Sequence, residues 1–97
     1  MLTGKQKRFL RGQAHHLKPI LQVGKGGVNE NLVKQVADAL EARELIKVSI
    51  LQNCKEDKEV VAEEIKHGAK AELVQIIGKT LIYYKESKEQ KSIELPR

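Results

Sequence analysis

The fold is decided by residues 20–29, which read Ile20-Leu21-Gln22-Val23-Gly24-Lys25-Gly26-Gly27-Val28-Asn29. The first four residues are mainly apolar and predict a short strand, and the glycines that follow end it. Asn29 is a favourable N-cap, and it stands before apolar residues at helical spacing, Leu32, Val33, Val36, Ala37 and Leu40. This stretch therefore predicts a strand, a tight glycine turn and a helix.

A first helix is predicted upstream of this stretch. Thr3 and Gln6 have the spacing of a capping box, in which each side chain bonds the backbone of the other residue. An apolar stripe follows at helical spacing, formed by Leu10, Ala14 and Leu17 with Phe9 beside it. Basic residues occupy the remaining circumference of this helix, and Pro19 marks the end of the helical region.

Downstream, apolar residues recur at every second position instead of at helical spacing. Residues 45–51 predict a strand, one face of which is formed by Ile46, Val48 and Ile50. Two further β-rich runs, residues 71–77 and 80–85, are joined by Gly78-Lys79, which predicts a two-residue hairpin turn.

A third helix is predicted between these strands, from about Lys55 to His67. Its inward positions are expected to be Val60, Val61 and Ile65. Gly68 follows directly, and glycine is the usual residue at a helix C-terminus, so we expect it to be the stop.

The predicted order is helix, strand, helix, strand, helix, strand, strand, which is an α/β fold. Strand–helix–strand connections cross over right-handed, so we expect a mixed four-stranded sheet with packed helices and an antiparallel last pair. A chain of 97 residues holds one modest core, which we assign to a single domain over residues 1–85. Residues 86–97 form a polar tail that we expect to be loosely held, although Ile93 and Leu95 could make a brief edge pairing.

The net charge of +5 is unevenly distributed along the chain. Residues 1–28 contain no acidic residue and six basic ones, Lys5, Lys7, Arg8, Arg11, Lys18 and Lys25. The other twelve of the 18 Lys and Arg residues share residues 29–97 with all 13 Asp and Glu residues. A scattered surplus would indicate only solubility, but a segregated one favours a face that binds a polyanion, because neutralising phosphates releases counterions.

The glycine run Gly24-Lys25-Gly26-Gly27 is the strongest candidate site. Its Gly-x-x-Gly pattern matches the loop with which KH domains clamp a nucleic-acid backbone. The helix that follows presents free N–H groups and the positive end of its dipole, and Lys25 adds a mobile cation. A tight strand-to-helix turn would explain the glycines equally well, but the run lies inside the acid-free segment. We therefore predict an RNA-binding site formed by Gly24, Lys25, Gly26, Gly27, Asn29, Lys5, Lys7, Arg8, Arg11 and Lys18.

Other motifs give weaker signals. The loop lacks the spacing of a phosphate-binding Walker motif and the third glycine of a dinucleotide fingerprint. Glu64-x-x-His67 has no second copy to complete a metal pair, and His15-His16 has no third ligand nearby. Cys54 has no convincing base or orienting partner for nucleophilic chemistry, and we expect it to be semi-buried. We therefore expect no catalytic residue, no metal and no cofactor.

The few aromatic residues limit how RNA could be recognised. Phe9, Tyr83 and Tyr84 are the only three, and adjacent tyrosines in a strand point to opposite faces. Single-strand binders usually stack bases on aromatic rings. The composition therefore favours recognition of folded RNA through its backbone and shape.

Two runs of the sequence resemble a known family. The run Leu17-Lys18-Pro19-Ile20-Leu21-Gln22-Val23-Gly24-Lys25-Gly26-Gly27-Val28 is similar to the signature of the CRM domain in its small bacterial stand-alone form, the YhbY proteins. Residues 71–85 resemble the second signature of that family, although Tyr84-Lys85 stands where many relatives carry Tyr-Arg.

The resemblance implies an RNA-binding domain whose sheet is similar to the C-terminal domain of translation initiation factor 3. It further implies association with 23S rRNA precursors in pre-50S particles, through the glycine loop and the neighbouring basic residues. We accordingly expect a monomeric, non-catalytic assembly factor. Cys54 stands alone and the apolar stretches are too short to span a bilayer, so we also expect a cytoplasmic protein that makes no contact with a membrane. Two alternatives remain open, a sequence-tolerant DNA-binding protein and a phosphometabolite enzyme that uses the loop as its anion site.

Overall fold

The computed structural model describes all residues from Met1 to Arg97. Its elements follow the predicted order and confirm the α/β class: α1 Gly4–Ala14, β1 Pro19–Val23, α2 Glu30–Arg43, β2 Leu45–Ile50, α3 Lys58–Ala69, β3 Glu72–Ile77 and β4 Thr80–Tyr84. Both predicted caps are formed. Thr3 and Gln6 bond reciprocally at the start of α1, and the Asn29 side-chain oxygen accepts from the Leu32 N–H at 2.8 Å.

The four strands form one mixed sheet in the order β1-β2-β4-β3. β1 pairs with β2 in parallel, and β4 lies between β2 and β3, antiparallel to both. The β3–β4 hairpin turns at Gly78-Lys79 as predicted, with Gly78 at a φ of 58°. β1 and β3 are the edge strands, and an edge is where a strand that begins with proline is tolerated.

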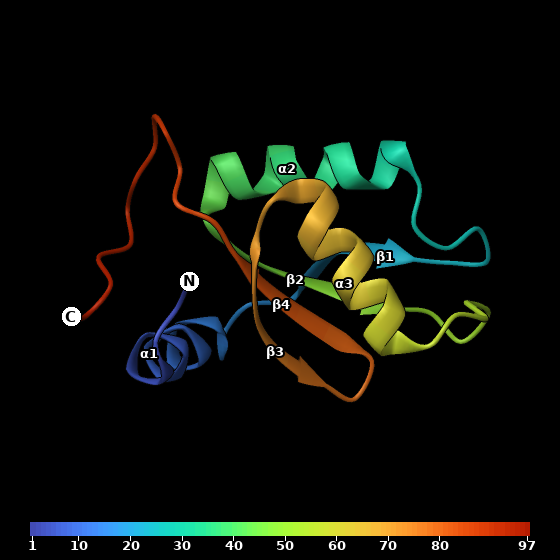
Figure 1. Ribbon diagram of the computed structural model, residues 1–97, viewed down its shortest axis with the longest axis horizontal. Helices are drawn as coiled ribbons and strands as arrows, with labels where there is room; N and C mark the ends of the chain where they lie inside the picture. The colour runs from blue at the N-terminus through green and yellow to red at the C-terminus, as the bar shows by residue number, and fades with distance from the viewer.

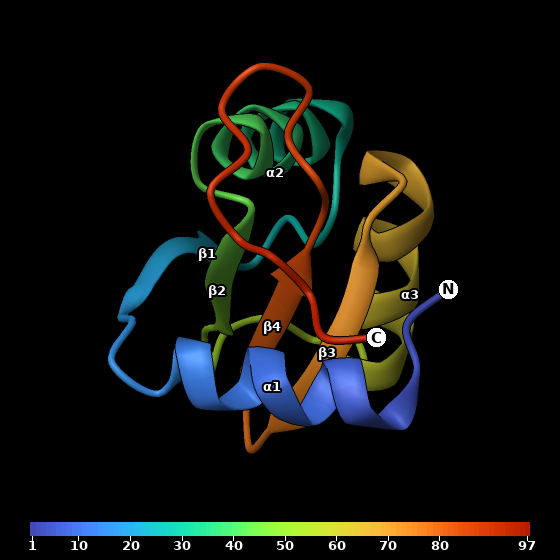
Figure 2. The same ribbon diagram turned by 90° about the vertical axis from the view of Figure 1, so that its left-hand side faces the viewer.

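The helices cover the two faces of the sheet unequally (Figures 1 and 2). α2 and α3 lie on one face, where fifteen buried residues form the larger core cluster. α1 lies across the other face, where Leu10 and Ala14 pack against Leu45, Ile82 and Tyr84 in a smaller cluster. The period of two in β2 and β4 follows from this arrangement, because alternate residues enter different clusters.

The third helix differs from its prediction at both ends. It begins at Lys58 rather than near Lys55, so residues 51–57 form a loop. Gly68 lies inside the helix rather than after it, because α2 packs closely here: a Cβ at this position would meet the Val33 methyl groups at 2.9 Å. The helix ends instead at Ala69, and its C-cap residue Lys70 has a φ of 54°. Val60 is 45% exposed, so its predicted inward position is wrong.

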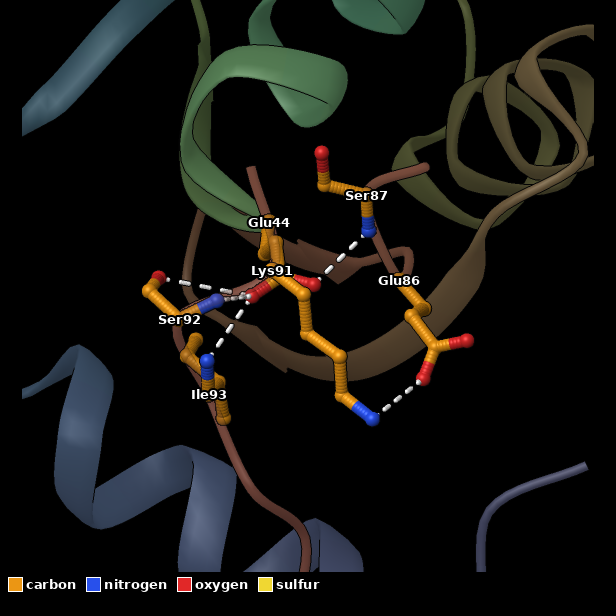
Figure 3. A network of polar contacts seen from close by, with 6 residues as sticks. All are labelled: Glu44, Glu86, Ser87, Lys91, Ser92 and Ile93. Carbon is orange, nitrogen blue, oxygen red and sulfur yellow. Dashed lines mark hydrogen bonds and ion pairs between the residues drawn. The ribbon is translucent and has the colours of Figure 1, made fainter. Parts of the chain in front are cut away.

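Residues 86–97 leave β4, arch past α2 and then descend to α1 (Figure 2). Two carboxylates near the C-terminus of α2 hold its backbone. Glu44 accepts hydrogen bonds from the N–H groups of Ser87, Ser92 and Ile93 at 2.7, 2.7 and 2.8 Å (Figure 3). Glu41 accepts from the Ser87 hydroxyl at 2.8 Å and from two further backbone N–H groups.

The same segment then reaches α1. Ile93 and Leu95 pack against the α1 cluster, and the Gln6 side chain donates to the Pro96 carbonyl oxygen at 3.1 Å. Neither Ile93 nor Leu95 belongs to a strand, so the edge pairing considered from the sequence is not formed. The segment is held by specific hydrogen bonds where its composition predicted a loose tail.

Candidate nucleic-acid interface

The glycine run forms a four-residue turn between β1 and α2. The Gly27 N–H donates to the Gly24 carbonyl oxygen at 3.0 Å, so Lys25 and Gly26 are the exposed central residues. Gly27 has a φ of 67°, and a side chain would be strained there. Gly26 has an ordinary φ and nothing within 4 Å of a Cβ built on it. Gly27 therefore makes the turn, while Gly26 leaves its outer surface open.

The turn and the first turn of α2 present a row of unused backbone donors. Asn29 uses its side-chain oxygen to cap Leu32. No acceptor in the chain takes the N–H groups of Lys25, Gly26, Glu30 and Asn31. These donors lie at the positive end of the α2 dipole, where an anion is stabilised.

Acidic residues also lie near the turn, although the turn itself belongs to the acid-free segment of residues 1–28. Glu30 is in the first turn of α2, and the Glu56 Oε1 atom lies 3.5 Å from the position of a Gly27 Cβ. Asn53 similarly borders Gly24 at 3.8 Å. No pattern in the sequence of the glycine run indicated this neighbouring loop. The loop lies beside the glycine turn because β1 and β2 pair in parallel, with Val23 opposite Ile50. The segments that follow two adjacent parallel strands meet at one edge of the sheet, so two parallel neighbours would have indicated this contact.

The cationic side chains of α1 are at least partly exposed to solvent and form no ion pair within the chain. Lys5, Arg8 and Arg11 are exposed and Lys7 is partly exposed. The two ion pairs of the chain lie elsewhere, His67 with Glu63 at 3.5 Å and Lys91 with Glu86 at 3.2 Å. The charge of the α1 cations is therefore not neutralised within the protein.

The structure does not bring the predicted residues into one compact patch. The molecule measures 38 × 26 × 23 Å, and α1 and the glycine turn lie at opposite ends of its long axis (Figure 1). Lys18 precedes β1 and Lys25 follows it, and a strand of this length spans about 17 Å. The predicted residues therefore form two groups joined by the edge strand β1.

The remaining candidates have ordinary surroundings. His15 and His16 are exposed, with their rings edge to face at 5.6 Å. Cys54 is buried in the larger core cluster, and His67 pairs with Glu63 rather than with Glu64. No three His, Cys, Asp or Glu side chains are placed to share a metal ion. No helix is both long and apolar enough to span a bilayer.

Both tyrosine rings are buried. Tyr83 is 0% exposed and donates its hydroxyl to the Ala62 carbonyl oxygen at 2.8 Å, and Tyr84 is 5% exposed in the α1 cluster. Burial raises the pKa of Tyr83, so its hydroxyl remains a donor. Neither ring is available to stack on a nucleobase.

A family model, that of the CRS1 / YhbY (CRM) domain, matches residues 2–85, which include the glycine turn, α1 and the whole sheet. The chain belongs to this family. The resemblance found in the two signature runs is thereby confirmed.

CRM relatives match over the full length of the chain. The "Probable RNA-binding protein YqeI" of Bacillus subtilis is 71% identical over 96 residues, which are 99% of this chain and 100% of that protein. An "RNA-binding protein" of Haemophilus influenzae is 42% identical over 96 residues, 99% of this chain and 96% of that protein. The solution structure of SAV1595 from Staphylococcus aureus superposes with a TM-score of 0.82 at 58% identity, over 99% of this chain and 100% of that one.

Proposed function

We propose that this chain is a non-catalytic RNA-binding factor that acts in the cytoplasm, as a monomer, during assembly of the large ribosomal subunit. Its target would be structured 23S rRNA precursor in pre-50S particles. Family membership and the RNA-binding names of the relatives support RNA as the partner. The ribosomal role rests on the resemblance of the two signature runs to YhbY proteins.

The observation that carries this proposal is the open row of donors at the glycine turn. An RNA phosphate placed there would accept from the free N–H groups of Gly26, Glu30 or Asn31 and lie beside Lys25. The absence of a side chain at Gly26 allows the phosphate to approach the backbone closely.

The cations of α1 would provide a second contact, separated from the turn by the length of β1. Two contacts at a fixed separation suit a backbone whose phosphates are themselves fixed, and ordering a flexible strand costs additional entropy. Both tyrosine rings are buried and Phe9 packs against the α1 cluster, so the chain presents no aromatic platform on which successive bases could stack. This geometry favours folded RNA over single strands.

A substitution at Gly26 tests the turn. Gly26→Asp should lower affinity for a folded rRNA fragment at least about tenfold, because a carboxylate would face the phosphate. Gly26→Asn adds a side chain of equal size without charge and is the matched control, and its affinity should fall much less. Circular dichroism and a binding titration on the same samples give both readouts. A folded Gly26→Asp protein with wild-type affinity would exclude the turn as the contact.

Charge reversal tests α1. Replacing Lys5 and Arg8 by Glu should reduce the slope of log K against log salt by about 0.7–0.9 for each phosphate that the protein no longer neutralises. Lys66 and Lys70, at the C-terminal end of α3, are the control pair. If charge reversal of the two pairs changed the salt slope equally, the segregated charge would indicate only solubility and not an RNA-binding face.

Competition separates the remaining alternatives. Folded rRNA should displace the bound fragment at least about tenfold better than an unstructured oligonucleotide or duplex DNA of equal length. Crosslinking in cells followed by sequencing of the bound RNA should recover 23S precursor. Equal competition by duplex DNA would favour the sequence-tolerant DNA-binding alternative.

A further inference from the structure

The sheet face under α1 is only half covered. α1 buries the part formed by the start of β2 and the end of β4, including Leu45 and Tyr84. The other half, toward the glycine turn, remains at least partly exposed. The strand register places on it Gln22, Lys47, Ser49, Gln75, Ile77 and Thr80, which we call the open sheet half.

The open sheet half has an unusual composition for the centre of a sheet. Lys47 lies on the central strand β2 between Ile46 and Val48, which are 1% and 0% exposed on the opposite face. Its ammonium group forms no ion pair and no hydrogen bond. Its direct cross-strand neighbours are Pro19 and Ile82. Apart from Ile77, the other members of the open sheet half carry hydroxyl or amide side chains, and none carries a carboxylate or an aromatic ring. This surface suits a polar, negatively charged occupant.

Two cations of α1 border the same surface. Leu10 and Ala14, both 0% exposed, face the sheet. Gln13 and Leu17 line a hollow with Leu45 and Ile93 at the start of β2, so that flank of the helix faces away from the open sheet half. Lys7 and Arg11, spaced four residues apart, lie on the opposite flank by helical geometry. They therefore form the wall between α1 and the open sheet half.

The open sheet half also joins the two groups of predicted contacts. At one edge it meets α1, and at the other Gln22 and Ser49 lie one residue before Val23 and Ile50, after which the glycine turn and its neighbouring loop begin. A groove between α2 and α3 also starts at this turn, but two carboxylates, Glu30 and Glu64, line it against the single cation of Lys34. Carboxylates repel phosphates, so the sheet offers the more favourable route.

We propose that the open sheet half binds the sugar-phosphate backbone of the same RNA, with Lys47 at a phosphate between the glycine turn and α1. This inference rests on the proposed RNA-binding function and deepens it. Charge complementarity selects RNA as the occupant, since Lys47, Lys7 and Arg11 face it without a carboxylate between them. The Ser49 and Thr80 hydroxyls and the Gln22 and Gln75 amides would bond ribose 2′-hydroxyls, which occur in RNA and not in DNA.

The first test compares two partly exposed lysines. Lys47→Glu should lower affinity for a folded rRNA fragment by at least about fivefold and reduce the salt slope by about 0.7–0.9. Lys66→Glu is the matched control, because Lys66 is also partly exposed and its side chain also has no partner, but it lies on α3 behind the opposite face. It should leave the slope unchanged. Neither lysine supports the core, so both variants should fold.

A proximity measurement tests the location independently of charge. Ser49→Cys, labelled with a short photo-crosslinker, should attach to the bound RNA fragment, whereas Gln35→Cys on the exposed side of α2 should not. The native thiol of Cys54 is buried, and the labelled wild-type protein gives the background. Crosslinking from Ser49→Cys no stronger than from Gln35→Cys would overturn the proposal.

The outcomes separate the two proposals. If Gly26→Asp abolishes binding while Lys47→Glu keeps wild-type affinity and salt slope, the RNA-binding function stands and the sheet contact is refuted. If the wild-type protein fails to bind folded RNA at all, the function itself is refuted. Reduced affinity in Lys47→Glu together with crosslinking from Ser49→Cys supports both.

Discussion

The two ends of α2 differ in whether the chain itself supplies an acceptor for the backbone N–H groups found there. At its N-terminus the glycine turn leaves backbone N–H groups without acceptors in the chain, so any anion must come from outside. At its C-terminus the chain supplies both partners. Glu41 and Glu44 accept the backbone N–H groups of Ser87, Lys88, Glu89, Ser92 and Ile93. We call the end with unpaired donors the open end and the end with paired donors the closed end.

The closed end is arranged against the helix dipole. Carboxylates are disfavoured in the last turn of a helix, where cations are preferred. Burial raises the pKa of the Glu44 carboxyl, but hydrogen bonds from Ser92, Ser87 and Ile93 outweigh it and hold the pKa below its ordinary value. The backbone N–H of Lys88 and the Ser87 hydroxyl likewise lower the pKa of Glu41. The comparison shows that a few backbone donors can overcome an unfavourable dipole, and at the open end they act together with a favourable one.

The largest effect is expected from removing the acceptor at the closed end. Glu44→Ala leaves three backbone N–H groups without their carboxylate, and we expect a loss of about 2–4 kcal/mol in the free energy of unfolding. Alanine keeps a Cβ, so the strain at the Glu44 φ of 66° is unchanged. Urea unfolding measures the loss, with Glu64→Ala as control, because Glu64 is an exposed helical glutamate without a hydrogen-bond partner. Equal stability of the two variants would show that the network does not hold the segment.

A smaller effect is expected at the turn of the open end. Gly27→Ala forces a side chain into a φ of 67° and should cost about 1–2 kcal/mol of unfolding free energy. Gly26→Ala, with free space and an ordinary φ, should change stability by less than about 0.5 kcal/mol. Thermal or urea unfolding of both variants distinguishes them, and a reversed order would contradict the geometry of the turn.

Charge reversal at each end should affect RNA binding differently. Lys25→Glu at the open end should lower affinity for folded RNA about fivefold, or roughly 1 kcal/mol, and reduce the salt slope. Lys88→Glu is the matched change at the closed end, where the donors are already occupied by Glu41. It should leave both quantities unchanged. Equal losses would mean that the closed end also contacts RNA.

The least pronounced effect is a dependence on pH at the closed end. Because the pKa values of Glu41 and Glu44 lie below 4.5, their stabilising contribution is complete above about pH 4.5 and is lost as the pH falls through the lowered values. Amide exchange at Ser87, Ser92 and Ile93 should therefore accelerate, relative to the intrinsic rate, on acidification toward about pH 3. In Glu44→Gln this acceleration should be weaker, and increased protection at low pH would contradict the assignment.

The local structure of the open end was predictable because its determinants are local. Asn29, the glycines and the apolar spacing of α2 all lie within a few residues of one another, and the period of two identified β2 directly. The closed end could not be predicted in this way. The partners of Glu44 lie 43 to 49 positions further along the chain, and no local pattern links them. The only local indication of this network was a pair of carboxylates, Glu41 and Glu44, three residues apart at the C-terminus of a helix, where cations are preferred.

Tertiary packing accounts for the other differences. Gly68 has the composition of a helix stop, but Val33 of α2 requires glycine inside α3. The acid-free segment predicted the cations of the candidate site but not their separation along β1, nor the approach of Glu56 to Gly27. Lys47 was not among the predicted site residues, because a single lysine in a strand is normally an exposed alternate residue.

The contact between Gln6 and Pro96 has a consequence for synthesis of the protein. These residues are 90 positions apart, so α1 leaves the ribosome long before residues 93–96 can cover it. β4, which lies between β2 and β3, is also the last strand to be made. The nascent chain therefore displays the cations of α1 before any complete sheet exists to support them. We expect α1 to acquire its final position only after residue 96 has left the exit tunnel.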